Sequence, residues 1–343
     1  MDKADFLKKL SFSDYDFLRT NKNLGKNIIL VGLGGSYAYG TNTPESDIDI
    51  RGCALNSKRN ILTNKNFEQV IDMSTDTVIY SFDKLVSLLC NCNPNTIELL
   101  GFEPDEYLYC SKIGKELLDN KNLFLSKKAV QSFGGYATAQ LRKLDNKAVR
   151  TVEQSKREEH ILNSIKNAYV TFPEKYFGFE EDSIKLYIDK AVQEDYDTEI
   201  FMDVHLTHYP LRDYKAMWSE MNNIVKSYSK IGGRNKYAAT HDKLGKHMMH
   251  LIRLYLMCLD ILEKNQIVTK RPEHNLLMDI RNGKYLDGDN QPVSEFYDMV
   301  DDFENKLKYA AEHTDLPDKP DYKKINEFVA SVNEKVVRGE LQV

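Results

Sequence analysis

Two aspartates set two residues apart, Asp47 and Asp49, are the residues of this chain best suited to chemistry. In an extended strand their carboxylates project from one face, while Ile48 and Ile50 point to the other. Adjacent carboxylates repel one another, and a hard divalent cation relieves that repulsion. Mg²⁺ is typically bound through one or two carboxylates together with the phosphates of a substrate. The pair therefore predicts a metal-dependent site for a phosphate compound.

A glycine-rich turn precedes the two aspartates. Gly34, Gly35 and Ser36 follow an apolar segment at residues 28–33 that reads as a strand. Glycines permit close approach of the backbone, and free N–H groups in such a turn cradle phosphate oxygens. We therefore expect a nucleoside triphosphate here, with the Gly35 N–H and the Ser36 hydroxyl on its β- and γ-phosphates. The run is neither a Walker-type loop, because no Gly-Lys-Ser/Thr follows, nor a dinucleotide fingerprint, because no long helix with an acidic residue about 20 positions on follows.

Composition sets the class of protein. The chain has 343 residues, of which 41% are hydrophobic and 29% charged, enough for one large domain or two ordinary ones. Its formal net charge of −5 gives no overall attraction to nucleic acid or to an anionic membrane. Five cysteines, an odd number, and the absence of a signal peptide or a long apolar run favour a cytoplasmic protein without a membrane partner. The oligomeric state is left open.

The pattern of elements predicts an α+β fold in two parts. Residues 1–110 alternate helix and strand, which predicts a small mixed sheet with helices on one face as the catalytic domain. Residues 111–343 are mostly helical, with an inserted hairpin expected near 183–206, and are expected to complete the nucleotide and acceptor site. The expected strands are 28–33, 47–55 and strand material in 67–80. The expected helices are 81–90, 126–144, 153–169, 209–227, 238–264, 294–313 and 324–338, with joints at 231–235 and 282–283.

The order and spacing of the polar residues resemble a known signature. A lone Gly-Gly-Ser is commonly only a turn, and a lone Asp-x-Asp is often a solvated strand edge. Here Gly35-Ser36, Gly40 and Ser46-Asp47-x-Asp49 follow the pattern of the DNA polymerase beta-like nucleotidyltransferase superfamily. Later segments are similar to its RNA-repair-associated branch in bacteria and phages, from about Ile28 to Lys284. These segments are 76–81, 93–95, 98–100, 135–137 with 140–141, and 246–254.

The resemblance implies a nucleotidyl transfer with two Mg²⁺ ions, for which Mn²⁺ can substitute. A nucleoside monophosphate passes from the triphosphate to a hydroxyl acceptor, which is an RNA end, a protein or a small molecule, and pyrophosphate leaves. Asp47 and Asp49 would hold the ions with a third carboxylate. That third residue is Asp76, at the start of an apolar strand where the family has an acidic residue, or its rival Asp72, which has a similar apolar setting. We favour Asp76.

The helical half offers further nucleotide contacts. Lys246, His250 and Arg253 lie at i, i+4 and i+7 of the expected helix 238–264, so they span roughly 10 Å along one face. Such a cationic stripe suits triphosphate oxygens, although charged helix faces are commonly only solvated. Four further residues complete the expected nucleotide-binding set: Tyr39, Ser46, Gln140 and Lys143.

Two other functions stay open at this point. One is a catalytically inactive nucleotide-binding or scaffold protein of the same fold. The intact Gly35-Ser36 and Asp47-x-Asp49 argue against it, because an inactive copy has no chemical need for paired carboxylates. The other is an enzyme of the toxin or antitoxin type that nucleotidylates a protein.

Overall fold

The computed structural model describes residues 3–149, 154–170, 172–176, 179, 183–190, 192, 198–229, 241–288 and 291–340, with some helical side chains outside this description. By contacts the chain divides into two compact units. The first comprises residues 1–139, 249–280 and 295–343, and the second comprises 140–248 and 281–294. The division at residue 110 was predicted from the change to a mostly helical sequence, and it stays a prediction.

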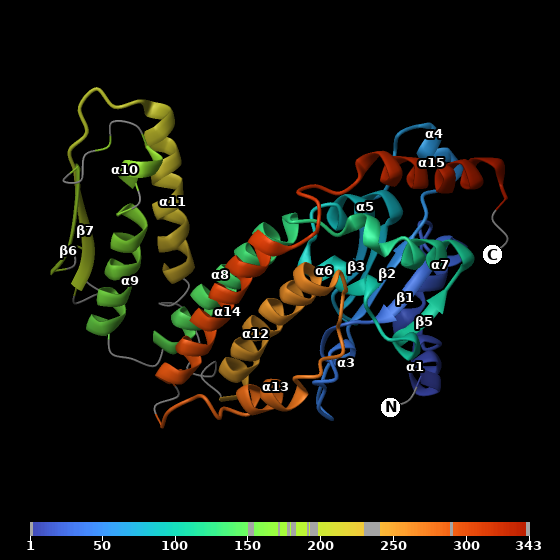
Figure 1. Cartoon of the computed structure of the whole chain (residues 1–343), viewed down its shortest axis with the longest axis horizontal. Coiled ribbons are helices and arrows are strands. Elements are labelled where there is room, and N and C mark those ends of the chain that lie inside the picture. Colours follow the sequence, from blue (N-terminus) through green and yellow to red (C-terminus); the bar gives the residue numbers. More distant parts are fainter. Residues whose placement is uncertain are drawn as a thin grey trace. The chain divides into compact units, whose positions relative to one another are not determined.

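A five-stranded mixed sheet organises the first unit (Figure 1). Its strands are β1 Ile28–Leu33, β2 Ile50–Ala54, β3 Gln69–Asp72, β4 Thr77–Ser81 and β5 Tyr107–Cys110. Their order is β3-β4-β2-β1-β5, in which β2 and β4 are parallel and the other neighbours antiparallel. The α+β class and the mixed sheet are as predicted from the sequence.

Short helices surround this sheet and longer ones complete the unit. Those near the sheet are α1 Lys3–Leu10, α2 Phe17–Thr20, α3 Gly35–Ala38, α4 Lys58–Leu62, α5 Phe82–Leu89, α6 Pro94–Ile97 and α7 Lys112–Asp119. The C-terminal ones are α13 His274–Arg281, α14 Ser294–His313 and α15 Tyr322–Arg338. Two long helices, α8 Lys128–Val149 and α12 His241–Lys264, contribute residues to both units. The start of the expected helix at 238–240 lies outside the described residues, as does the expected joint at 231–235.

The sheet differs from the prediction at the strand that carries the aspartates. β2 begins at Ile50 rather than at residue 47, so Asp47 and Asp49 precede the strand. The alternation of side chains nevertheless holds, because Ile48 and Ile50 both pack into the same hydrophobic cluster. Arg51 therefore follows Asp49 on the opposite face. Strand β5 was not expected, because four residues give too short a periodic pattern to recognise. Helix α7 was not expected either.

The apolar face of the sheet packs against the N-terminal segment. Phe6 of α1 and Leu18 of α2 lie in the same buried cluster as strand residues from β1, β2, β4 and β5. The buried members of this cluster are Phe6, Tyr15, Leu18, Leu24, Val31, Leu33, Ile50, Ala54, Ile79 and Leu108. The segment before residue 28 thus forms several short helical turns that cover the sheet.

The second unit is a helical layer over a hairpin. Its elements are α9 Gln154–Tyr169, α10 Phe172–Lys175, β6 Ile184–Lys190, β7 Thr198–Val204 and α11 Leu211–Ser229. β6 and β7 pair antiparallel, with Ile188 opposite Ile200, which is the hairpin expected near 183–206. Its core joins Phe179 with apolar side chains of α9, α10, α11 and β6: Leu162, Ile165, Phe172, Ile184, Leu186, Met217 and Met221.

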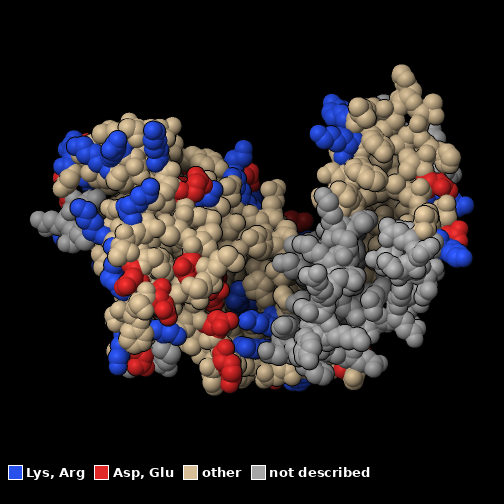
Figure 2. Space-filling view, turned by 180° about the vertical axis from the view of Figure 1, so that it is seen from behind, with Lys and Arg blue, Asp and Glu red and all other residues tan. Residues whose placement is uncertain are grey.

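Surface charge is unevenly distributed. On the face seen in Figure 2, Lys and Arg side chains gather over the upper part of the first unit, at the left, and acidic side chains lie below them. None of the helices described here combines the length and apolar character needed to cross a bilayer. All five cysteines are free thiols, as expected of a chain that uses no disulfides.

The close approach of β1 and β2 generates a prediction about Gly52. A Cβ atom added at Gly52 would lie 2.5 Å from the Leu30 carbonyl oxygen and 2.8 Å from Ile79 Cδ1. We predict that Gly52→Ala lowers the free energy of unfolding by about 1–3 kcal/mol, the usual effect of overpacking, as measured by urea denaturation. The matched control is Gly134→Ala on α8, whose added Cβ meets no described atom within 4 Å. It should stabilise by up to about 1 kcal/mol, and equal effects of the two changes would contradict the prediction.

Candidate functional site

The turn between β1 and α3 closes around Asp49. The Gly34 N–H donates to the Asp49 carbonyl oxygen at 2.8 Å. Gly35 has φ +56°, and a Cβ atom built on it would lie 1.8 Å from Asp49 Oδ2. Only glycine both adopts this backbone conformation readily and leaves room for the carboxylate. The half-buried Ser36 is the next residue of the same turn, and its carbonyl oxygen accepts from Thr41 N–H at 2.9 Å.

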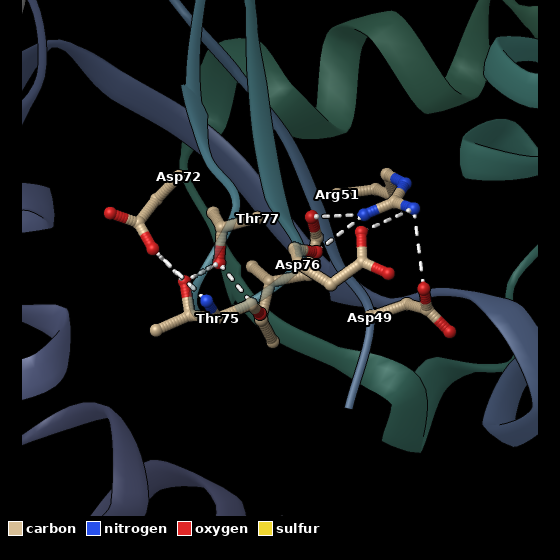
Figure 3. Close-up of polar contacts among 7 residues, drawn as sticks. Asp49, Arg51, Asp72, Thr75, Asp76 and Thr77 are labelled. Carbon is tan, nitrogen blue, oxygen red and sulfur yellow. Dashed lines mark hydrogen bonds and ion pairs between the residues drawn. The ribbon is translucent and has the colours of Figure 1, made fainter. Parts of the chain in front are cut away.

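Parallel pairing of β2 with β4 brings Asp49 next to Asp76. Ile50 lies opposite Thr77 in the sheet, and the two aspartates immediately precede these residues. The Arg51 guanidinium joins them: its Nη2 atom lies 3.3 Å from Asp49 Oδ1 and 3.2 Å from Asp76 Oδ1 (Figure 3). The site thus consists of two carboxylates sharing one cation.

The carboxyl of Asp49 is harder to ionise than an ordinary aspartate. Burial, followed by a hydrogen bond shared with Asp76, raises its pKa to about 6, although the positive charge of Arg51 opposes the rise. The negative charge on Asp76 adds to the rise. A carboxyl in this setting releases its proton more readily when additional positive charge arrives.

Asp72, the rival for the third carboxylate, serves a turn. Its Oδ1 atom accepts hydrogen bonds from the backbone N–H and the hydroxyl of both Ser74 and Thr75, at 2.6–3.1 Å. The Ser74 hydroxyl bond contributes most to lowering the pKa of Asp72. Figure 3 shows Asp72 directed at this turn and away from Asp49. Of the two candidates, Asp76 is the one that lies beside Asp49.

The carboxylates fit a divalent cation as a pair. Asp47 is exposed and forms no ion pair with a described residue. Among the described residues no three His, Cys, Asp or Glu side chains converge as a metal site, and the trio of Asp47, Asp49 and Asp76 stays a prediction. Two adjacent carboxylates are the number that Mg²⁺ typically takes from a protein when phosphates supply the other ligands. That Asp49 and Asp76 already share a cationic group shows that the donor set accommodates positive charge.

A buried polar cluster supports the far end of the glycine turn. The Tyr39 hydroxyl donates to Glu98 Oε2 at 2.6 Å, and both residues are less than 10% exposed. The Arg253 guanidinium carbon lies 3.5 Å from the centre of the Tyr39 ring, and its Nη2 atom lies 2.7 Å from His250 Nδ1. Burial raises the pKa of Glu98, whereas Arg253 and the Tyr39 hydroxyl counteract the rise. Tyr39, His250 and Arg253 are thus brought together, and Tyr39 is part of the core.

The other predicted nucleotide-binding residues lie in varied settings. The Ser46 hydroxyl accepts from Thr43 N–H at 2.8 Å and so stabilises the loop before Asp47. Gln140 is buried, whereas Lys246 is exposed on α12, and both belong to the second unit. The side chain of Lys143 lies outside the described residues. Their roles in binding stay predictions.

Arg51 and Glu98 received no role from the sequence. Arg51 continues the alternation of Asp47 and Asp49, and this spacing was the signal that could have identified it as their counter-charge. Glu98 stood in one of the matched segments, but no local pattern indicates that it is buried. Its partner Tyr39 is 59 residues away in the chain.

Comparison with known proteins gives the following relationships. A model of the family described as "RNA repair pathway DNA polymerase beta family" matches residues 13–331. An uncharacterized 38.9 kDa protein from the nrdC-mobD intergenic region of Enterobacteria phage T4 is 24% identical over 302 residues, covering 79% of this chain and 86% of that protein. No solved structure matches the chain.

The contact between Gly35 and Asp49 generates a prediction with an internal control. Gly35→Ala should force Asp49 Oδ2 out of its position, because the new Cβ would lie 1.8 Å from it. Gly40 also has a positive φ, +66°, but a Cβ there meets only Lys270 Cγ, at 3.9 Å. We predict that Gly35→Ala is more destabilising than Gly40→Ala by about 1–3 kcal/mol, as measured by chemical denaturation. Indistinguishable losses would mean that backbone strain alone, and no steric contact with Asp49, is responsible.

The raised pKa of Asp49 predicts how stability depends on pH without metal. Between pH 4 and 6 the folded state keeps a proton on Asp49 that the unfolded state has released. The contribution of Asp49 to the free energy of unfolding therefore declines as pH rises. In EDTA, wild type should therefore lose stability relative to Asp49→Asn between pH 4 and 7. Asp72 provides the opposite control, because its lowered pKa makes wild type gain relative to Asp72→Asn as pH rises from low values. Trends of the same sign for both pairs would refute the assignment.

Proposed function

The chain belongs to the RNA repair pathway DNA polymerase beta family, which is of the nucleotidyltransferase type, and we propose that it transfers a nucleoside monophosphate from a nucleoside triphosphate to a hydroxyl acceptor. The carboxylate pair of Asp49 and Asp76, held against the glycine turn, is the observation that carries this proposal. A turn with close backbone approach and a carboxylate pair are the two parts that metal-assisted transfer from a triphosphate requires.

The protein groups have distinct parts in the proposed reaction. Asp49 and Asp76, with Asp47 from the preceding loop, would hold Mg²⁺ or Mn²⁺. When bound, the metal supplies charge stabilisation and activation of the attacking hydroxyl. The Gly35 N–H and the Ser36 hydroxyl would orient the β- and γ-phosphates, because they are in the turn that adjoins Asp49.

The buried cluster would keep this turn rigid. Tyr39 follows α3 directly, and its hydroxyl is fixed by Glu98 while its ring is covered by Arg253. We therefore infer that Arg253 acts at least in part by holding the turn. Direct phosphate contacts from Lys246, His250, Gln140 and Lys143 remain part of the proposal and rest on the family resemblance.

For the acceptor we favour an RNA end. The support is the description of the matched family, which refers to RNA repair. A protein or a small molecule as acceptor, and a nucleotide-binding protein without turnover, are the alternatives that the experiment must separate.

The decisive experiment incubates the protein with each of four α-labelled nucleoside triphosphates, Mg²⁺ and either RNA or a cell extract. We expect label in RNA and release of pyrophosphate. Asp49→Asn and Asp76→Asn should each reduce turnover by about a hundredfold or more, because metal assistance contributes several kcal/mol and each 1.36 kcal/mol is tenfold in rate. Asp72→Asn is the matched control and should retain most activity, because that carboxylate serves a turn.

Each other outcome has a defined meaning. Label in protein or in small molecules would replace RNA as the acceptor and leave the transfer chemistry in place. Nucleotide binding by calorimetry without pyrophosphate release would favour the inactive protein. Greater loss in Asp72→Asn than in Asp76→Asn would move the third carboxylate to Asp72.

A further inference from the structure

Arg51 makes more contacts with the carboxylate site than any predicted residue does. Its Nη2 atom bridges Asp49 Oδ1 and Asp76 Oδ1 at 3.3 and 3.2 Å. Its Nη1 atom donates to the Asp76 carbonyl oxygen at 2.6 Å and to the Ile50 carbonyl oxygen at 3.0 Å. One guanidinium therefore binds both the side chain and the backbone of Asp76.

These contacts hold a residue in an uncommon conformation. Asp76 has φ +45°, a left-handed value that residues other than glycine seldom adopt. Its carbonyl oxygen accepts from Arg51 Nη1 and also from the Ile50 N–H, at 3.1 Å. The start of β4 is thereby fixed against β2 with the Asp76 carboxylate directed at Asp49 (Figure 3).

The position of Nη2 is the second part of the argument. A cation that joins two adjacent carboxylates occupies the space between their oxygens, and Nη2 lies within ion-pair distance of one oxygen of each. The Arg51 side chain is only 19% exposed, so its charge is weakly screened by solvent. If a divalent cation were bound by both carboxylate oxygens, it would lie close to Nη2, and the two positive charges would repel each other.

We propose that Arg51 is the internal counter-cation of the carboxylate site, with Nη2 standing where a divalent cation binds and Nη1 keeping Asp76 in place. Nη2 must withdraw from the two carboxylates when metal is loaded, while Nη1 can stay on the Asp76 carbonyl. Arg51 is thus a positioning residue that organises the pair before metal arrives and lowers the net affinity for metal. This inference rests on the proposed metal-dependent function.

The test measures Mn²⁺ binding alone, by electron paramagnetic resonance at pH 8, for wild type and Arg51→Gln. Loss of one neighbouring positive charge should tighten Mn²⁺ binding about tenfold, while the metal-free variant unfolds at a lower temperature. An arginine with only a structural role would lower both stability and metal affinity. Unchanged or weaker Mn²⁺ binding in Arg51→Gln would therefore overturn the proposal.

Arg19 provides a matched control. Its guanidinium also holds backbone carbonyls, those of Leu10 and Phe12, together with an aspartate, Asp16. Arg19→Gln should lose stability without any change in Mn²⁺ affinity. An equal gain of Mn²⁺ affinity in Arg19→Gln would show that overall charge, and not the position of Arg51, is responsible.

A second measurement on wild type does not depend on whether a variant folds. With ¹⁵N-labelled arginine, saturating Mg²⁺ should shift the Arg51 guanidinium resonances and leave those of Arg19 in place, and an unmoved Arg51 signal would contradict the proposal. Asp49→Asn tests the metal site separately from the role of Arg51, because it should abolish Mn²⁺ binding. If neither wild type nor Arg51→Gln binds Mn²⁺, the metal site fails as well. If wild type binds but Arg51→Gln binds no more tightly, only the role of Arg51 fails.

Discussion

The parallel pairing of β2 with β4 is the constraint on which the site depends. It places Ile50 opposite Thr77 and so aligns the residues just before them, Asp49 and Asp76, which are 27 positions apart in the chain. The Ile50 N–H bond to the Asp76 carbonyl continues the ladder to this point. Because a slip of one residue turns every side chain to the other face, the register of one strand pair determines whether two carboxylates meet at all.

The sequence was informative where the determinants are local. Strand β1, the glycine turn and the alternation of Ile48 and Ile50 around Asp49 follow from spacing within some twenty residues. The choice between Asp72 and Asp76 also depended on a distant feature, because the pairing of β2 with β4 is what places Asp76 beside Asp49. Both aspartates have apolar neighbours in the sequence, and the hydrogen bonds from Ser74 and Thr75 show that Asp72 serves a turn.

The buried cluster of Tyr39, Glu98 and Arg253 shows more clearly that the sequence does not reveal partners far apart in the chain. Tyr39 and Arg253 are separated by more than two hundred residues, yet the guanidinium covers the ring and offsets the charge of Glu98. A stripe of cationic residues on a helix, such as the one containing Arg253, indicates that the cation has a partner. It does not indicate whether that partner is a ligand or a buried carboxylate. In the described structure Arg253 serves the carboxylate and the turn that Tyr39 anchors.

The contact between Gly35 and Asp49 makes the substitutions allowed at one position depend on the residue at the other. A side chain at position 35 has room only if the residue at position 49 is shorter or its carboxylate moves away. A substitution at position 35 therefore requires a prior change at position 49. If Asp49 is replaced by a shorter residue, the steric barrier at position 35 is removed, whereas the positive φ there still disfavours residues other than glycine. The two positions are therefore coupled in one direction: a change at position 35 requires a change at position 49, but a change at position 49 does not require one at position 35.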